Sequence, residues 1–424
     1  MVGHRTDRIM KGEDDMELTG SWTRYSKKIA VIQAGGPTAV LNSSLYGFLK
    51  EIVRMDRRTN VIGVHQGLSG LVNGDFFRLD MRQPLDWLKY QPGAVLGSGR
   101  MALSDTDLEI GVKQLKKADI HVVVLIGGNG TMWACSRLVS KAQEIGYGLQ
   151  VIGIPKTVDN DIAGIDHTPG FPSAANFVAH AVRDLSIDLK AMKNFEQVRI
   201  IETMGRNVGW LTAASAFFKK QEEDGPHLVY VPEKPFDINE MISAVSDIQA
   251  RLGYCVVVVS EGLKGESGQP IMMDGINGLK QNAGKKALGG VGSVLREAVS
   301  NELGLACRYE NLGILQRCAS FAVSKLDRIE AMVLGERAAQ LIFQGESGCM
   351  VGIERLSEQP YSWDIRKIAF DKVAGLEREL DSAYTNVTGT IDPSYRQWLS
   401  PFMSEAKSYK SLKTLSLLDM EETS

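Results

Sequence analysis

The chain has 424 residues, which is more than the roughly 250–300 residues at which one hydrophobic core usually stops growing, so its length predicts two domains. Its 44% apolar and 23% charged residues are typical of globular proteins, and a formal net charge of −3 gives no sign of a nucleic-acid-binding surface. No apolar run approaches the roughly 20 residues of a membrane span. We therefore expect neither nucleic acid nor membrane among the partners.

The five cysteines are scattered along the chain without a CxxC pair. This spacing argues against a zinc site and indicates reduced thiols, so we expect a cytoplasmic protein. Residues 1–26 are polar and lack the apolar segment of a signal peptide, and we expect them to form an N-terminal extension.

Short, almost continuously apolar segments alternate with helical patterns from residue 28 onward. Segments of that kind are typical of parallel strands covered on both faces. The predicted strands are residues 28–33, 60–65, 121–126, 150–155, 198–202, 228–231 and 255–260. The predicted helices are residues 40–55, 132–145, 174–190, 210–220, 238–252, 292–303 and 326–343. The alternation predicts an α/β fold class with two doubly wound, Rossmann-like domains.

The most informative segment is PKTVDND, residues 155–161, at the end of the predicted strand 150–155. In a parallel sheet, this carboxyl edge is where ligands bind. Phosphoryl transfer requires a positive charge beside the phosphates, a base for the attacking hydroxyl and acidic oxygens near Mg²⁺. Lys156, Thr157, Asp159 and Asp161 are residues of these types, so the segment predicts a kinase-like reaction.

Glycine-rich turns follow two other predicted strands. Residues 33–42 (QAGGPTAVLN) and 126–131 (IGGNGT) each join a strand to a helix, which brings backbone N–H groups to a phosphate. Neither turn matches the Walker A or GxGxxG pattern. Residues 96–100 form a small-residue loop that ends in Arg100, whose guanidinium suits phosphates. Each feature alone is more often a plain turn or a solvated side chain, but their recurrence at strand ends favours a phosphate site.

The second half of the chain repeats this pattern. Residues 204–206 (MGR) follow a predicted strand, and Glu261 follows another strand within the sequence SEGL. Residues 315–317 (LQR) add a further cation. These side chains are of the types that bind sugar hydroxyls and phosphates.

Together these motifs resemble the phosphofructokinase family over residues 28–353. PKTVDND is highly specific for that family, and GGNGT, MGR, the SEGL glutamate and LQR follow in the family's order. Residues 324–341 resemble the helix that follows LQR there. The resemblance implies a first domain over 27–170 that binds the phosphoryl donor and is completed by 316–360, and a sugar-phosphate domain over 171–315. It leaves 361–424 as a C-terminal wrap and tail.

The resemblance implies that Asp159 deprotonates the 1-hydroxyl of fructose 6-phosphate, which Mg-ATP then converts to fructose 1,6-bisphosphate. Lys156, Thr157 and Arg206 are the other implied catalytic residues. The implied sugar-phosphate ligands are Thr157, Asp159, Met204, Gly205, Arg206, Glu261, Arg308 and Arg317. The implied ligands of the phosphoryl donor are Gly36, Arg100, Gly128, Gly130 and Thr131, and those of Mg²⁺ are Asn129 and Asp161. A homodimer or homotetramer is also implied, because family members lend arginines to a neighbouring subunit.

Two residues point to different phosphoryl donors. In this family, the residue at Gly130 is glycine in ATP users and aspartate in pyrophosphate users, since a carboxylate would repel the α-phosphate of ATP. Lys156 is typical of the pyrophosphate-type branch. We expect ATP, because a missing side chain admits the larger donor and Lys156 suits either; the alternative is a pyrophosphate-dependent fructose-6-phosphate 1-phosphotransferase.

Three positions depart from the family pattern. Asn129 stands where many members have a metal-side aspartate, Gln197 where many have a phosphate-binding arginine, and Ile314 where a histidine or tyrosine contacts the sugar phosphate. Arg199 lies on the same strand face as Gln197 and is a candidate replacement. These departures keep two alternatives open, a kinase for another sugar phosphate and a non-catalytic regulatory paralogue. GGNGT also resembles the GGDGT loop of NAD and lipid kinases, but that reading explains neither PKTVDND nor MGR.

Overall fold

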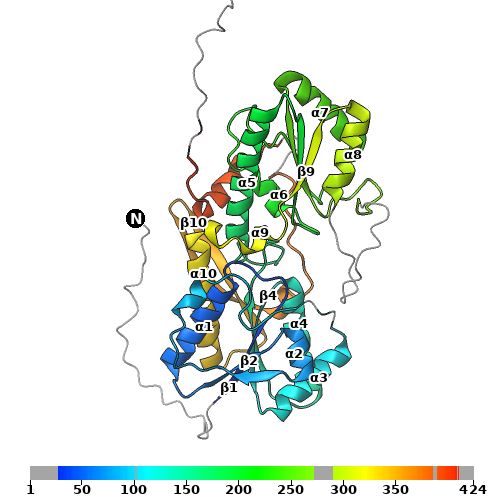
Figure 1. The fold of residues 1–424 in the computed structure, drawn as a ribbon. Coiled ribbons are helices and arrows are strands. Elements are labelled where there is room, and N and C mark those ends of the chain that lie inside the picture. The colour runs from blue at the N-terminus through cyan, green and yellow to red at the C-terminus, as the bar shows by residue number, and fades with distance from the viewer. Residues whose placement is uncertain are drawn as a thin grey trace, which may run out of the picture.

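The computed structural model describes residues 27–99, 101, 103–271, 290–384, 389–407 and 409. Two α/β lobes lie end to end, and the C-terminal part of the chain runs along both (Figure 1). Arg100, one of the predicted ligands of the phosphoryl donor, lies outside the described residues.

The first lobe is built on a seven-stranded sheet with the order β11-β10-β5-β4-β1-β2-β3. Its inner strands are parallel, and only the edge pairs β10–β11 and β2–β3 are antiparallel. In chain order the strands are β1 (Lys28–Gln33), β2 (Asn60–Val64), β3 (Phe76–Arg78), β4 (Val122–Gly127), β5 (Gln150–Pro155), β10 (Cys349–Glu358) and β11 (Tyr361–Ala369).

Successive side chains of a strand point to opposite faces of the sheet, so the first lobe has one hydrophobic core on each face of its sheet. Ile29 and Val31 of β1 pack with helices α1 (Leu41–Met55) and α10 (Lys325–Phe343) on one face. Ala30 and Ile32 pack on the other face, where the helices are α2 (Leu68–Asn73), α3 (Asp105–Lys117) and α4 (Asn129–Glu144). Both faces are covered, which explains the continuously apolar strands.

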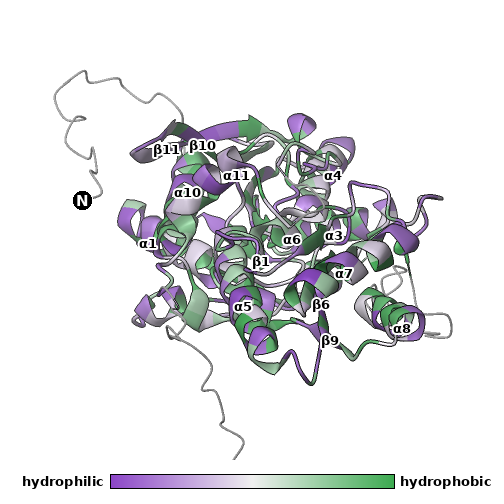
Figure 2. Cartoon of the chain, turned by 90° about the horizontal axis from the view of Figure 1, so that it is seen from above, coloured by the Kyte–Doolittle hydropathy of each residue, from purple (hydrophilic) through white to green (hydrophobic). Residues whose placement is uncertain are grey.

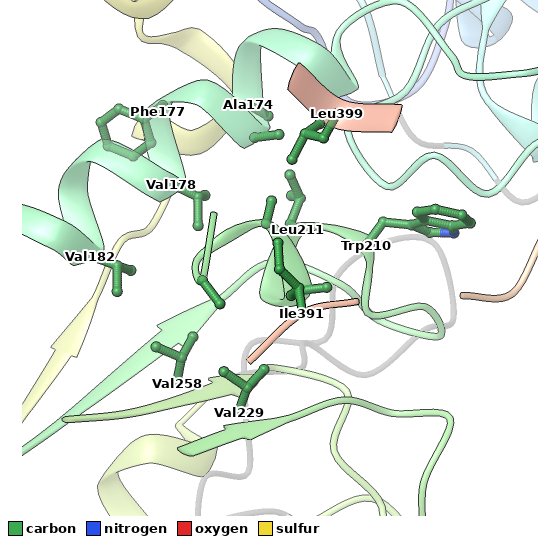
Figure 3. Close-up of a cluster of buried hydrophobic side chains, with 14 of the residues drawn as sticks. Ala174, Phe177, Val178, Val182, Trp210, Leu211, Val229, Val258, Ile391 and Leu399 are labelled. Carbon is green, nitrogen blue, oxygen red and sulfur yellow. The ribbon is translucent and has the colours of Figure 1, made fainter. Parts of the chain in front are cut away.

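The second lobe is a parallel four-stranded sheet, in the order β7 (Leu228–Tyr230), β8 (Cys255–Ser260), β6 (Val198–Thr203), β9 (Cys307–Asn311). One face packs against α5 (Phe171–Met192), α6 (Trp210–Ala214) and α11 (Pro393–Leu399), as Figure 3 shows for Val178, Leu211, Val258 and Leu399. The other face is covered by α7 (Ile238–Leu252) and α8 (Val291–Leu303). Both outer helices carry hydrophilic as well as hydrophobic residues (Figure 2), as expected for helices with one face in the core.

The predicted α/β class is confirmed, and each predicted strand is present with bounds that differ by at most one residue. The predicted helices also occur, with one large difference. The helix predicted over 210–220 ends at Ala214. The hydroxyl of Ser215 donates to the carbonyl of Thr212 (2.6 Å), a local bond that competes with continuation of the helix.

The sequence did not predict the hairpin of β10 and β11. β11 begins at residue 361, where a C-terminal wrap was expected, and extends the first sheet beyond that boundary. Its residues alternate between exposed and half-buried, so an edge strand of this kind lacks the apolar run that marks the inner strands. Among the described residues no helix is long and apolar enough to cross a membrane.

A buried ionic network connects the loop that follows the catalytic segment to α10 and to the hairpin of β10 and β11. The imidazole of His167 is fully buried between two carboxylates, with Nδ1 2.8 Å from Asp166 and Nε2 2.7 Å from Glu330. Arg355 donates two hydrogen bonds to Asp166, both 3.0 Å, and Tyr361 donates to Glu330 (2.7 Å). Burial alone would lower the pKa of His167, but the charges and hydrogen bonds of Glu330 and Asp166 outweigh it and raise that pKa to about 9.

This network predicts a pH-dependent stability. Between about pH 6.5, the ordinary pKa of histidine, and pH 9, the folded state binds a proton at His167 that the unfolded state releases, so stability should fall as pH rises. The free energy of unfolding in urea, measured from pH 6 to 9.5, should fall less steeply in His167→Gln than in the wild type. His65→Gln, which changes an exposed histidine, is the control; an unchanged slope in His167→Gln would contradict the assignment.

Candidate active site at the carboxyl edges of the two sheets

The first feature of the site is the buried ammonium of Lys156, which follows β5 directly and is 2% exposed. Its Nζ donates to the carbonyl oxygens of Ala34 (3.1 Å) and Gly36 (2.6 Å), and its backbone N–H donates to Gly127 (2.8 Å). One residue thus ties together the loops that follow β1, β4 and β5. Gly35, with φ +78°, makes the turn over the ammonium.

The loop that precedes Arg100 is drawn to the same place by buried amides. Gln33 donates to Asn42 (2.9 Å) and accepts from the backbone of Leu96 (3.0 Å). Ser98 donates to the carbonyl of Gly35 (2.6 Å). The described part of this loop therefore lies beside Gly35, the residue before the predicted donor ligand Gly36.

Helix α4 begins at the turn GGNGT, with Gly128 as its N-cap. A Cβ on Gly128 would lie 3.5 Å from the carbonyl oxygen of Lys156, whereas a Cβ on Gly130 would meet no heavy atom within 4 Å. Thr131 is buried and packs against Gly127. The N-terminal turn of α4 therefore faces open space at Gly130, with its backbone N–H groups and positive dipole available to an anion.

Three carboxyl groups meet across the lobes. The backbone N–H of Asp159 donates to the hydroxyl of Thr157 (3.1 Å), so the Thr157 side chain lies against the backbone of Asp159. Burial and the negative charge of Asp159 raise the pKa of Asp161 to about 7. The same two causes raise the pKa of Glu261, at the end of β8, to about 7. The charge of Asp159 thus acts on Asp161 of the first lobe and on Glu261 of the second.

The MGR loop lies beside Glu261. The backbone N–H of Met204 donates to the side chain of Gln316 (2.9 Å), and the N–H of Gly205 approaches Glu261 Oε1 at 3.5 Å. The charge of Arg206 acts to lower the pKa of Glu261. Through Gln316, the loop is also linked to α9 (Leu315–Cys318), the helix that carries Arg317.

Arg308 does not reach this site within its own subunit. It is the second residue of β9 and pairs with Arg199 of β6, near the amino ends of both strands. The catalytic loops lie at the carboxyl ends, roughly 13 Å away for a rise of about 3.3 Å per residue. The guanidinium of Arg308 pairs with Glu196 (3.1 Å) instead.

The structure also shows the surroundings of Gln197 and Ile314, which depart from the family pattern, and of Arg199. Gln197 donates to the carbonyl of Lys193 (3.1 Å) and accepts from the backbone of Ala306 (3.1 Å). Arg199 is buried, with its guanidinium bound to Glu196, Asp188 and the carbonyl of Leu185, so it does not replace the missing arginine. Ile314 is 55% exposed at the N-cap of α9.

The donor set suits Mg²⁺. Asp161 Oδ1 is buried and has no hydrogen-bond partner among the described residues. Asn129 donates through its amide nitrogen to the carbonyl of Leu376 (2.9 Å), which leaves the amide oxygen as its candidate ligand atom. No group of three acidic, histidine or cysteine side chains is placed to hold a metal in the described part of the chain. Mg²⁺ does not need one, because it retains waters and is usually shared between one or two carboxylates and the substrate phosphates.

Two positioning residues were missed at the sequence level. Buried Asp327 of α10 accepts hydrogen bonds from the backbone of Gly170 (2.9 Å) and Ser173 (3.1 Å) at the start of α5, and Gly170 forms a bridge with Thr157. Gln316 holds Met204 as described above. Gln316 lay inside the LQR motif, of which only the arginine was given a role, and Asp327 is an aspartate of a kind that is ordinary on a helix.

The fold and the site define a class of protein. Two α/β lobes place a buried ammonium, a helix N-terminus, a carboxyl cluster and an arginine-bearing loop around one junction, which is the equipment of a phosphotransferase. The sequence model described as phosphofructokinase matches residues 28–342. The chain therefore belongs to the phosphofructokinase family and is a phosphotransferase of that type.

Individual relatives cover nearly the whole chain. It is 42% identical over 375 residues to a sulfofructose kinase of Alkalicoccus urumqiensis, with 88% of this chain and 94% of the relative aligned. It is 36% identical over 389 residues to a pyrophosphate–fructose 6-phosphate 1-phosphotransferase of Rhodospirillum rubrum, covering 89% and 95%. The crystal structure of a pyrophosphate-dependent phosphofructokinase from Marinobacter aquaeolei is similar with a TM-score of 0.79 and 27% identity, over 91% of this chain and 94% of that one.

Gly205 offers a direct test of the MGR loop. Its φ is +140°, and a Cβ there would lie 2.5 Å from the carbonyl oxygen of Val208. Gly205→Ala should therefore displace the loop, at a cost of about 1–3 kcal/mol in local strain, and raise the KM for the sugar more than the KM for the phosphoryl donor. Gly148→Ala, where a Cβ meets no atom within 4 Å, is the control; equal kinetics in the two variants would show that the loop tolerates the side chain.

Proposed function

We propose that this chain transfers the terminal phosphoryl group of ATP to the 1-hydroxyl of a fructose that carries a tetrahedral anion on C6. The observation that carries the proposal is the convergence of Asp159, Asp161 and Glu261 opposite Lys156 and the N-terminus of α4. Fructose 6-phosphate is the acceptor that the motifs imply.

In the proposed reaction, Asp159 accepts the proton of the 1-hydroxyl as that oxygen attacks the phosphorus in line. Glu261 and the MGR loop hold the sugar, so that the hydroxyl lies beside Asp159. Lys156, held by two carbonyl oxygens, and the N–H groups of α4 stabilise the charge on the transferred group. Mg²⁺, when bound by Asp161 and Asn129, supplies a further positive charge at the phosphates.

The choice of ATP depends on Gly130. A Cβ at this position would meet no protein atom within 4 Å, so a side chain there would project into the space proposed for the donor. Glycine leaves that space to the α-phosphate and nucleoside of ATP. Lys156 is held by backbone carbonyl oxygens. Its ammonium suits ATP and pyrophosphate equally, so it does not decide between the two phosphoryl donors.

A second acceptor, a fructose with a sulfonate on C6, is favoured by the residues at the positions that the family resemblance assigns to the C6 phosphate. Gln197 is neutral and bound to backbone groups, Arg199 is neutralised by Glu196 and Asp188, and Ile314 offers no hydrogen bond. A sulfonate carries one negative charge where a phosphate carries nearly two, so it needs fewer cations. The 42% identity to a sulfofructose kinase supports the same acceptor.

The proposed site is shared between subunits. Arg308 is about 55% exposed at its side chain and lies far from the catalytic loops of its own chain, so we propose that it serves the C6 anion of a neighbouring subunit in a homo-oligomer.

A panel of acceptors tests the proposal. The purified chain with Mg-ATP should phosphorylate both C6-anionic fructoses, and kcat/KM should be higher for sulfofructose than for fructose 6-phosphate. In Asp159→Asn, kcat should fall by about 10²–10⁴-fold, the usual contribution of a general base, while sugar binding persists in calorimetry. No turnover of any C6-anionic fructose with either ATP or pyrophosphate would reject the function, and a preference for fructose 6-phosphate would reject the sulfonate.

The identity of the phosphoryl donor is tested at Gly130. In Gly130→Asp, a carboxylate within about 4 Å of the α-phosphate would be repelled by about 4 kcal/mol at an effective dielectric constant of 20, so kcat/KM for ATP should fall at least about tenfold. Gly130→Asn adds nearly the same volume without the charge and should lose less. The assignment of ATP would be contradicted if Gly130→Asp left the ATP kinetics unchanged. It would also be contradicted if the wild type used pyrophosphate but not ATP.

A further inference from the structure

Residues 376–380 cross the junction of the two lobes beyond the range 28–342 that the family model matches; we call this segment the clasp. On the first-lobe side, Asn129 donates to the carbonyl of Leu376 (2.9 Å), and the N–H of Arg378 donates to the carbonyl of Asp161 (2.9 Å). Glu377 forms an antiparallel bridge with Ile162. The clasp thus binds both segments proposed to hold Mg²⁺.

On the second-lobe side, the clasp binds the sugar loop and the helix that follows it. The carboxylate of Glu377 accepts a hydrogen bond from the side chain of Asn207 (2.7 Å). The indole of Trp210 donates to the carbonyl of Arg378 (3.1 Å), and the N–H of Leu380 donates to Glu233 (3.0 Å). Glu233 also accepts from the N–H of Gly209 (2.8 Å), so the clasp and the start of α6 share one carboxylate.

The clasp is fixed by its own packing. The guanidinium of Arg378 lies 4.4 Å from the ring centre of Trp210 and 5.6 Å from that of Trp398, and it donates to the carbonyl of Asp166. Leu380 is buried in the core of the second lobe. Glu377 is exposed, but Arg378 and Leu380 anchor the segment on which it lies.

We propose that Glu377 is a positioning residue, which holds the sugar-binding loop 204–207 against the catalytic segment 159–162. Asn207 directly follows Arg206, and its partner Glu377 is paired by its backbone with Ile162, next to Asp161. The chain Arg206–Asn207–Glu377–Ile162–Asp161 thus links the two loops through one side-chain hydrogen bond and one backbone bridge. The proposal rests on the proposed function for its kinetic consequence.

Gln316 accepts from the N–H of Met204 (2.9 Å) and Ser260 donates to the carbonyl of Gly205 (2.5 Å), so these contacts fix the loop to α9 and β8. The bond to Glu377 adds a contact with the segment that pairs with Ile162. Gly205 adopts φ +140°, a conformation with few steric limits for glycine, and its N–H is 3.5 Å from Glu261, which is long for a hydrogen bond. The bond from Asn207 to Glu377 is 2.7 Å and involves a carboxylate, the class of hydrogen bond with about twice the strength of a neutral one. Loss of this bond should let Arg206 move relative to Asp159.

Three variants test the proposal. Glu377→Ala removes the acceptor, so the KM for the sugar should rise about tenfold, the effect of about 1.4 kcal/mol, with a smaller change in the KM for ATP. Glu377→Gln keeps an oxygen that accepts from Asn207 and should stay within about threefold of the wild type. Glu379→Ala, which removes another exposed carboxylate of the same segment, is the control and should leave both constants unchanged.

Asn207→Ala should reproduce Glu377→Ala, and the double variant should add little, since both remove one bond. A sugar KM that is unchanged in Glu377→Ala, or raised equally in Glu377→Gln, would overturn the proposal, because the second result assigns the effect to charge.

Hydrogen–deuterium exchange separates this proposal from the proposed function. In the peptide that covers residues 203–209, exchange should be faster in Glu377→Ala than in the wild type and Glu377→Gln, whether or not the chain turns over the acceptors tested. Faster exchange in a chain with no kinase activity would retain the positioning role and reject the function. Equal exchange in all three proteins would overturn the positioning role even in an active enzyme.

Discussion

The arrangement of the catalytic loops depends on the burial of one ammonium. Lys156 is 2% exposed, and its Nζ donates to the carbonyls of Ala34 and Gly36. A buried charge is tolerated only when such partners satisfy it, so the loop after β1 must close over the end of β5. Gly35 permits that closure. Lys156 also binds the residue before the N-cap of α4 through its backbone. The hydrogen bonds of this lysine therefore determine how the loops proposed to bind phosphates are arranged.

Opposite this positive edge, the protein gathers negative charge. Burial and the negative charge of Asp159 raise the pKa values of Asp161 and Glu261 to about 7. Desolvation and repulsion between carboxylates both disfavour the ionised forms of these two groups. Lys156 and Arg206 act in the opposite direction. Such a site is most stable when cationic and hydrogen-bonding partners occupy it, and a sugar hydroxyl, a cation and phosphates are partners of these kinds. The grouping that destabilises the carboxylates is therefore also what gives them affinity for substrates.

The inner strands and the catalytic loops could be predicted from the sequence, because continuous apolar runs and glycine turns are local signals. Lys156 and Gly128 lie close together because parallel strands of the first sheet end at one edge. Glu261 follows a strand of the second sheet, and no local pattern predicts that the two edges face each other. Strand β11 could not be predicted, since it is largely exposed and carries no apolar run; β10 does begin with the buried apolar segment 349–353, which is not among the predicted strands. The pairing of Arg199 with Glu196 and Asp188 could not be predicted either, because an arginine on a strand gives the same sequence signal whether it binds a ligand or a carboxylate of its own chain. Asp327 and Glu377 act across more than 150 residues of sequence on Gly170 and Asn207, and no local pattern announces such a contact.

The C-terminal part of the chain explains how the two lobes keep one geometry. β10 and β11 complete the first sheet, whereas Tyr395, Trp398, Leu399 and Phe402 enter the core of the second lobe. The clasp lies between these two attachments, so its position is determined by packing in both lobes. A hinge at the junction would change the distance from Asp159 to Arg206, and 1 Å is enough to impair an in-line transfer. Since each lobe contributes only part of the site, the segment that belongs to both cores is the one best placed to keep that distance constant.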